Sequence, residues 1–271
     1  MRDQIGFIGG GQMAEALIKG IIASGLYLEQ EILVSEPNDF RREHLENTYS
    51  VRTFHTNIPL FENCKIIILA VKPQTMRGML EECRDRVQTQ HILVSIAAGL
   101  PISFYINTIG KSETKIIRVM PNTPALVLEG ASALSRNSNV SDQELREAEK
   151  IFLAVGEVVI LDESHLDAVT GLSGSGPAYV FSFVEALVDA GVKAGLTRVV
   201  SEKLALQTVS GSIKLLRETG EHPASLRGKV TSPGGTAITA LHVLEKVGFH
   251  GIIMDIVESA VIRSKQLGEM E

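Results

Sequence analysis

The first 162 residues alternate short apolar runs with longer stretches of helical spacing. The apolar runs are IGFIG, EILVS, KIIILAV, HILVSIA, KIIRVMP and VVILD. Several are apolar at consecutive positions, which is typical of strands buried on both faces of a parallel sheet. Between them, MAEALIKGIIASG and DQELREAEKIFLAVG have helical periodicity and end in a glycine suited to a C-cap. The pattern predicts βαβ units in a doubly wound α/β domain over residues 1–162.

After Asp162 the strand patterns stop and helical patterns take over. They are GPAYVFSFVEALVDAGVKAG, SEKLALQTVSGSIKLLRETG and one long pattern over 236–268. These predict an all-helical domain over residues 163–271. Small and apolar side chains occupy more than one face of the first helix, namely Val184, Ala186, Leu187, Ala190 and Ala194. One small domain could hardly bury them alone, so the pattern favours a dimer interface, with burial inside a larger monomer as the alternative.

Composition narrows the class of partner. The chain has 271 residues, 44% of them hydrophobic and 24 of them glycine, and a formal net charge of −6. A nucleic-acid surface needs clustered Lys and Arg, which the sequence lacks, so a small-molecule partner is favoured. Cys64 and Cys83 have neither disulfide nor metal-ligand spacing, which predicts no metal site and fits a reducing cytoplasm.

The sequence also gives no sign of a targeting or membrane segment. Residues 1–3 lead directly into the first apolar run, which leaves no room for a cleavable leader. The apolar runs are shorter than the roughly 20 residues that span a bilayer. We therefore expect a cytoplasmic protein with no membrane contact.

A glycine-rich motif follows the first predicted strand. In IGFIGGGQMAEAL, Gly9, Gly11 and Ala14 have the spacing of the dinucleotide fingerprint, at the point where a helix opens. Gly9 would form the turn, Gly11 would let a pyrophosphate approach, and Ala14 would allow close helix packing. The motif and its βαβ context predict a Rossmann-type domain that binds a nucleotide cofactor. A purely structural turn is the alternative.

The end of the second predicted strand gives conflicting signals about the cofactor. Ser35, Glu36 and Asn38 come first, followed by Arg41 and Arg42. An acidic residue here usually accepts the ribose hydroxyls of NAD, whereas a nearby Arg can bind the 2′-phosphate of NADP. The two arginines could equally lie on a solvated helix face. The sequence therefore predicts NADPH or, alternatively, NADH.

Two further strand ends carry small residues and free backbone groups at the sheet edge where α/β ligands bind. They are ILAVKPQ and VSIAAG, although Pro73 could be an ordinary first-turn proline. In RVMPNTPALV, two prolines bracket Asn122 and Thr123. This arrangement suggests a rigid wall beside the cofactor ring.

The segment KVTSPGGTAITALHVLE, residues 229–245, places a Gly-Gly turn directly before a helix pattern. The first N–H groups of a helix lack internal partners and carry partial positive charge, so the turn favours an anion. A tight entry to the helix with no ligand is the alternative reading.

Other chemistries lack the necessary residues. No Ser-His-Asp set, His/Cys cluster or carboxylate pair stands out, which argues against hydrolysis and metal chemistry. Hydride transfer needs mainly positioning, because the nicotinamide performs the chemistry. We interpret five of the seven histidines as surface or packing residues and not as general acids, namely His55, His165, His222, His242 and His250.

Six motifs together resemble the pyrroline-5-carboxylate reductases. In chain order they are GFIGGGQMAEALIKG, ILAVKPQ, VSIAAG, RVMPNTPA, VTGLSGSGPAYVF and VTSPGGTAITALHVLE, and the last two are the most specific. The resemblance implies reduction of 1-pyrroline-5-carboxylate to L-proline, the last step of proline biosynthesis, by NADPH or NADH. It also implies a helical domain that interlocks with a second subunit as a homodimer, with larger assemblies of dimers in many members.

The resemblance also assigns candidate residues. The substrate carboxylate is expected at the backbone around Ser232, Gly234, Gly235 and Thr236, and Glu163 matches a substrate-contacting position. Except for Asn57, the expected cofactor-binding residues lie in the glycine-rich loop and at the strand ends described above. The full set is Ile8, Gly9, Gly10, Gly11, Gln12, Met13, Ser35, Glu36, Asn57, Ala70, Val71, Lys72, Pro73, Ala97 and Ala98.

One position departs from the family pattern. Many members have a threonine second after the glycines, whose hydroxyl meets the substrate nitrogen, whereas this chain has Ala237. We expect Thr236, Thr231 or a water to take that catalytic contact instead.

Two other functions remain as alternatives. A β-hydroxyacid dehydrogenase would need a catalytic lysine, and Lys193, Lys203 and Lys214 lack its glycine-rich setting. The second is a regulator that binds the cofactor but no longer catalyses the reaction. Ala237, which departs from the family pattern, is the only feature that favours it.

Overall fold

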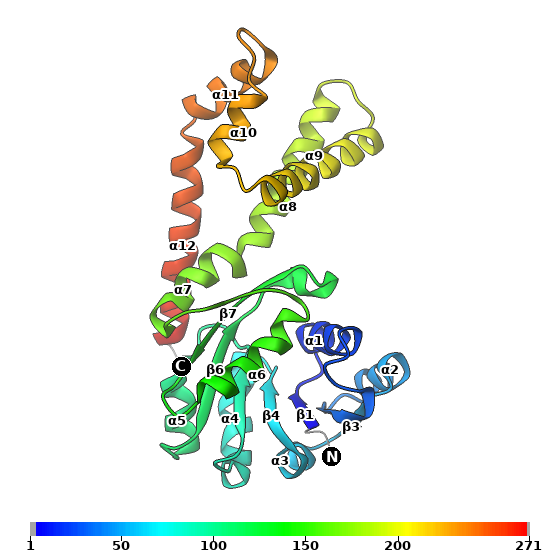
Figure 1. Ribbon diagram of the computed structural model, residues 1–271, viewed down its shortest axis with the longest axis vertical. Coiled ribbons are helices and arrows are strands. Elements are labelled where there is room, and N and C mark those ends of the chain that lie inside the picture. The colour runs from blue at the N-terminus through cyan, green and yellow to red at the C-terminus, as the bar shows by residue number, and fades with distance from the viewer. Residues whose placement is uncertain (1–3, 270–271) are drawn as a thin grey trace. The chain divides into compact units, whose positions relative to one another are not determined.

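A computed structural model describes residues 4–269 (Figure 1). The expectation that no cleavable leader is present depends on residues 1–3, which lie outside this range. The chain packs as two units: one comprises the residues up to Ser175 together with those from Ser259 onward, and the other runs from Gly176 to Glu258. The domain boundary at residues 162 and 163 is a separate expectation, which stays a prediction.

The first unit is built on one eight-stranded sheet with the order β3-β2-β1-β4-β5-β6-β7-β8. All neighbouring strands are parallel except β6 and β7, which are antiparallel. The strands are β1 (Gln4–Ile8), β2 (Ile32–Ser35), β3 (Arg52–Phe54), β4 (Cys64–Leu69), β5 (Ile92–Ser95), β6 (Lys115–Met120), β7 (Gly130–Arg136) and β8 (Gly156–Ile160). The order reverses between β1 and β4, which is the switch point where such sheets bind ligands.

Helices cover both faces of the sheet. They are α1 (Gln12–Ala23), α2 (Asp39–Tyr49), α3 (Ile58–Asn63), α4 (Pro73–Cys83), α5 (Ile102–Ile109), α6 (Asp142–Leu153) and the short α7 (Leu166–Val169). Residues that alternate along a strand enter different cores. Ile66 and Ile68 of β4 pack in the cluster that contains α1 and α6, whereas Ile67 and Leu69 pack in the cluster that contains α3, α4 and α5. The expected doubly wound α/β sheet is therefore confirmed.

The six expected strands are present, and the structure adds two more. β3 has only three residues, and β7, with the sequence GASALSR, is rich in small and polar side chains. Neither has the apolar run that marks a buried strand. β7 forms because its backbone pairs with β6 on one side and β8 on the other.

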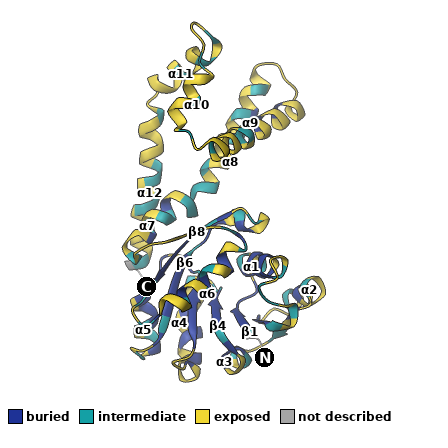
Figure 2. Cartoon of the chain, viewed as in Figure 1, coloured by how far each residue is buried: buried dark blue, intermediate teal, exposed yellow. Residues whose placement is uncertain are grey.

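The second unit is helical, as expected. Its helices are α8 (Gly176–Lys193), α9 (Arg198–Thr219), α10 (Pro223–Lys229), α11 (Thr236–Lys246) and the first part of α12 (Phe249–Glu269). The long final pattern is two helices rather than one, because Gly248 takes a left-handed conformation at φ +72° between α11 and α12. Most residues of these helices are exposed within this chain (Figure 2).

Across residues 4–269, no group of three or more His, Cys, Asp or Glu side chains is arranged to hold a metal ion. In the same range no single helix is long and apolar enough to cross a bilayer. Together, α11 and α12 have the necessary length and apolar composition, but they are bent by 50° where they meet.

Candidate functional site

The loop between β1 and α1 depends on its glycines for two different reasons. Gly9 has φ +96°, and a Cβ there would lie 2.8 Å from the backbone oxygen of Ala70 at the end of β4. A Cβ on Gly11, by contrast, would meet nothing within 4 Å. Gly9 is thus required by the fold, while Gly11 leaves open space at the start of α1. No side chain caps this helix, so its first N–H groups are available to an anion.

A cavity of about 600 Å³ opens beside this loop. Nine of the expected cofactor residues line it, namely Ile8, Gly9, Gly11, Ser35, Glu36, Asn57, Ala70, Val71 and Lys72. They come from the carboxyl ends of β1, β2 and β4 and from the segment after β3. The open cradle at Gly11 and the size of the cavity both fit a dinucleotide.

The other expected cofactor residues lie near the same sheet edge without lining that cavity. Gly10 donates its N–H to Glu36 Oε2 at 2.9 Å, Gln12 and Met13 begin α1, and Pro73 begins α4. Ala97 is buried and Ala98 is exposed after β5. Their contact with a cofactor stays a prediction.

Sequence reasoning missed six residues of the cavity wall, namely Pro37, His55, Thr56, Thr75, Met79 and Glu82. Thr75, Met79 and Glu82 lie on one face of α4, at spacings of four and three residues. This periodicity was visible in the sequence. His55 and Thr56 follow β3, the short strand that has no apolar run, so they carried no usable signal.

The two arginines of α2 make contacts within the protein. Arg41 donates to Glu15 on α1 and to the carbonyl oxygen of Gly10. Burial alone would raise the pKa of Glu15, but hydrogen bonds from His44, Arg41 and Tyr49 outweigh it and lower the pKa to about 2. Glu15 therefore stays charged and holds the N-terminus of α1 against α2.

Glu163 makes two hydrogen bonds within the first unit. Its Oε1 accepts from the backbone N–H of Ile102 at 2.7 Å and from Arg118 NH1 at 3.0 Å. Arg118 is buried, so the pair holds the segment after β8 against β6 and the start of α5. The expected contact of Glu163 with substrate stays a prediction.

The Pro-bracketed segment after β6 is tied to two other segments by Asn122, and its expected rigidity stays a prediction. Asn122 donates to the carbonyl oxygen of Ser173 at 3.0 Å and accepts from the N–H of Ala131 at 2.8 Å. Thr123–Val127 continues as a short 3₁₀ helix. The Asn122 side chain therefore serves the fold, and the position of this wall beside a cofactor ring stays a prediction.

The Ser-Pro-Gly-Gly turn leads into α11 in the second unit. Gly234 is left-handed at φ +67°, a conformation that favours glycine. A Cβ on Gly235 would lie 2.2 Å from Ser232 Oγ, so a larger residue there would displace the serine hydroxyl. The N–H of Gly235 closes the turn onto the carbonyl of Ser232 at 3.1 Å. The N–H groups left without a helical partner are those of Thr236, Ala237 and Ile238, which carry the positive end of the helix dipole.

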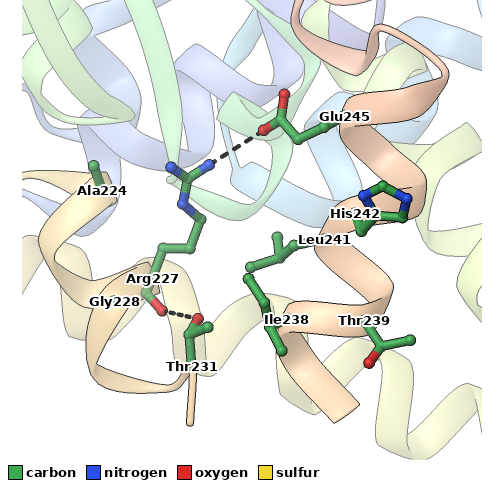
Figure 3. Close-up of a pocket in the computed structure, with 9 residues that line it drawn as sticks. All are labelled: Ala224, Arg227, Gly228, Thr231, Ile238, Thr239, Leu241, His242 and Glu245. Atoms are coloured by element: carbon green, nitrogen blue, oxygen red, sulfur yellow. Dashed lines mark hydrogen bonds and ion pairs between the residues drawn. The ribbon is translucent and has the colours of Figure 1, made fainter. Parts of the chain in front are cut away.

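A hollow of about 750 Å³ lies next to this turn, between α10 and α11 (Figure 3). Thr231, Thr239 and His242 lie on its wall, and Arg227 NH1 approaches Glu245 Oε1 at 3.6 Å. Neither the turn residues themselves nor Ala237 line it.

The hydroxyl groups of Thr231 and Thr236, which are expected to contact the substrate nitrogen, have different surroundings. The Thr231 hydroxyl donates to the carbonyl oxygen of Arg227 at 2.7 Å, so it can only accept a further hydrogen bond. Thr236 is the exposed first residue of α11, and Ala237 beside it is half-buried. The catalytic roles of Thr236 and Thr231 stay predictions.

The chain is similar along nearly its whole length to proteins named pyrroline-5-carboxylate reductase. The family model described as "Pyrroline-5-carboxylate reductase dimerisation" matches residues 163–267, and "NADP oxidoreductase coenzyme F420-dependent" matches residues 4–99. A pyrroline-5-carboxylate reductase of Synechocystis is 46% identical over 269 residues, which cover 99% of this chain and 100% of that protein. The Escherichia coli enzyme of the same name is 38% identical over 269 residues, with the same coverage.

Solved structures agree with this similarity. A pyrroline-5-carboxylate reductase from Coxiella burnetii is 35% identical and superposes with a TM-score of 0.93, over 98% of this chain and 99% of that one. A Plasmodium falciparum pyrroline carboxylate reductase with NADP bound is 35% identical with a TM-score of 0.88, over 98% of each chain. With identities of this size along its full length, the chain belongs to the pyrroline-5-carboxylate reductase family.

Proposed function

We propose that this protein reduces 1-pyrroline-5-carboxylate to L-proline, with NADPH or NADH as the hydride donor. The observation that carries the proposal is the 46% identity to a pyrroline-5-carboxylate reductase along the full length of both chains. The open dinucleotide cradle at Gly11 and the anion-favouring turn before α11 supply the two binding sites that the reaction needs. The lysine-dependent dehydrogenase alternative is disfavoured by the family assignment, and Lys193, Lys203 and Lys214 are exposed.

The residues around β1, β2 and β4 fit a dinucleotide. The N–H groups at the start of α1 would bind the pyrophosphate, and Glu36 would accept hydrogen bonds from ribose hydroxyls. When bound, the reduced nicotinamide supplies the hydride. The protein's own part is to fix that ring beside the substrate and to exclude water.

The start of α11 is the proposed site for the substrate carboxylate. The N–H groups of Thr236, Ala237 and Ile238 are unsatisfied within the helix and face an anion with the favourable end of the dipole. In the balanced reaction, the imine carbon gains a hydride and the ring nitrogen carries one proton from solvent. A protonated imine is already electrophilic, so Thr231 or Thr236 needs only to hold its N–H.

We also propose that the protein is a homodimer, and that larger assemblies of dimers form. The match of residues 163–267 to the dimerisation family supports the dimer. Ala186 and Ala190 on α8 and Ala194 just after it remain exposed within the chain, as does Phe181, which is 66% exposed. These residues are not buried by their own monomer, which favours a partner subunit. A cytoplasmic location is supported by Cys64 and Cys83, both free thiols.

The test is a direct assay of the purified protein. We expect loss of reduced nicotinamide absorbance on adding 1-pyrroline-5-carboxylate, with L-proline as the product by chiral chromatography. Protein without imine and imine without protein are the controls. Folded protein that binds a nicotinamide dinucleotide but forms no proline with either donor would instead indicate a cofactor-binding regulator.

A further inference from the structure

We propose that Glu36 makes this protein selective for NADH over NADPH. The inference rests on the proposed use of a nicotinamide cofactor, but it concerns binding and not turnover. Three features of the first unit carry it: the way the Glu36 carboxylate is held, the contacts that engage the neighbouring arginines, and the position of Lys72 on the cavity wall.

The Glu36 carboxylate is fixed at the wall of the dinucleotide cavity. Its Oε2 accepts from the N–H of Gly10 at 2.9 Å, and its Oε1 accepts from the N–H of Asn38 at 3.0 Å. The backbone N–H of Glu36 itself donates to the carbonyl of Phe54 at 3.0 Å. One hydrogen bond thus ties the carboxylate directly to the glycine loop that receives the pyrophosphate.

The contacts that hold Glu36 leave acceptor capacity. A carboxylate has about four lone-pair sites, and the two backbone donors occupy two of them. The remaining sites suit the two hydroxyls of an adenosine ribose, which are hydrogen-bond donors. A 2′-phosphate offers no such donor at neutral pH and brings about 1.5 to 2 negative charges against the carboxylate.

The cations of α2 do not compensate for this repulsion. The Arg42 side chain is 12% exposed; it donates to the carbonyl of Glu36 at 2.8 Å and pairs with Asp39. The Nη2 atom of Arg42 also lies 2.6 Å from His55 Nε2, so His55 contacts the same guanidinium group. Arg41 is paired with Glu15, so both guanidinium charges are balanced by carboxylates of the protein.

Lys72, the lysine among the described residues that line the cavity, lies on the other side of the switch point. Lys72 follows β4, whereas Glu36 follows β2, and β1 lies between these two strands in the sheet. In a fold of this type the adenosine ribose lies at the end of β2. Lys72 is therefore suited to the pyrophosphate or the nicotinamide half of the cofactor and not to a 2′-phosphate.

The experiment is a pair of equilibrium titrations of the full-length protein with NADH and NADPH, followed by nicotinamide fluorescence. We expect the dissociation constant for NADPH to exceed that for NADH on the order of tenfold or more, as repulsion between close like charges predicts. Equal affinities, or tighter binding of NADPH, would overturn the proposal. So would the failure of both dinucleotides to bind.

Glu36→Gln removes the charge and keeps the side-chain length, and Glu43→Gln is the matched control on the exposed face of α2. We expect Glu36→Gln to lower the NADPH-to-NADH ratio of dissociation constants on the order of tenfold, and Glu43→Gln to leave it unchanged. An unchanged ratio in folded Glu36→Gln contradicts the proposal. If that variant does not fold, adenosine 2′-phosphate and adenosine 5′-phosphate compete against NADH on the wild-type protein. Weaker competition by the 2′-phosphate supports the proposal, and equal or stronger competition overturns it.

These binding measurements separate the two proposals. A preference for NADH in a protein that does not reduce the imine would leave this inference standing and remove the proposed function. Reduction of the imine with tighter binding of NADPH would do the reverse.

Discussion

Replacing Gly11 with Val should abolish dinucleotide binding and leave the fold nearly intact. At φ −68° and ψ −177°, Gly11 has an extended backbone that valine adopts readily. Its Cβ would meet nothing within 4 Å in the protein, so the new side chain would project into the space that a pyrophosphate needs. The expected effect is therefore on ligand binding and not on structure.

The magnitude follows from the hydrogen bonds between the pyrophosphate and the start of α1. Blocking two such charge-assisted bonds removes about 3 to 6 kcal/mol, which weakens binding by roughly a hundredfold or more. Valine is a poorer N-cap residue than glycine, so unfolding should become easier by about 1 kcal/mol at most. Binding and stability should thus respond very differently to this one substitution.

Gly20→Val on the same helix is the contrasting variant. A Cβ at Gly20 would lie 2.4 Å from Val155 Cγ1 and 2.6 Å from the backbone oxygen of Ala154. Valine there should overpack the contact of α1 with the turn before β8 and cost about 1–3 kcal/mol or more. The cradle at Gly11 is untouched, so any Gly20→Val protein that remains folded should bind the cofactor.

The assays are isothermal titration with NADH and NADPH and denaturant unfolding followed by circular dichroism. Wild-type affinity in Gly11→Val would refute the assignment of this loop as the pyrophosphate site. A large loss of stability in the same variant would show that Gly11 serves the fold instead.

Three further predictions concern substrate, position 237 and pH. 1-Pyrroline lacks the carboxylate, so it cannot accept two charge-assisted hydrogen bonds at the start of α11. Its kcat/KM should therefore be about a hundredfold lower than that of 1-pyrroline-5-carboxylate, and equal values would refute the carboxylate site. Ala237→Thr should raise kcat/KM about two- to twelvefold if no other group contacts the nitrogen, the gain of one net hydrogen bond of about 0.5–1.5 kcal/mol. If a threonine already makes that contact, Ala237→Thr should leave kcat/KM unchanged in steady-state assays, whereas Thr236→Ala or Thr231→Val should lower it. A severe loss of kcat/KM in folded Ala237→Thr would contradict the proposed substrate. The pKa of Glu15 falls from 4.5 to about 2 on folding, so its contribution is complete above pH 4.5 and is lost as the pH falls toward 2. Glu15→Gln should therefore flatten the pH dependence of the unfolding free energy in that window, and an unchanged slope in urea titrations would contradict the assignment.

The sequence alone determined six of the eight strands and the glycine loop between β1 and α1. Consecutive apolar residues, as in KIIILAV, are typical of a strand covered on both faces, and the structure places alternate residues of β4 in two cores. Gly9 and Gly11 were identifiable by their spacing directly after the first strand, although only Gly9 is required by the turn itself. Local patterns succeed where the physical requirement is itself local.

Tertiary structure decided the features that depend on contacts between distant segments. β7 is a strand because its neighbours pair with it, although GASALSR has no strand pattern of its own. In the sequence, Arg41 and Arg42 were as compatible with a 2′-phosphate as with a solvated face. Asp39 lies one helical turn before Arg42 on α2, but only the fold brings Glu15 to Arg41. A charged side chain takes the partner with the best geometry, and for Arg41 that partner, Glu15, is 26 residues away in the chain. Sequence spacing carries no record of that distance in space.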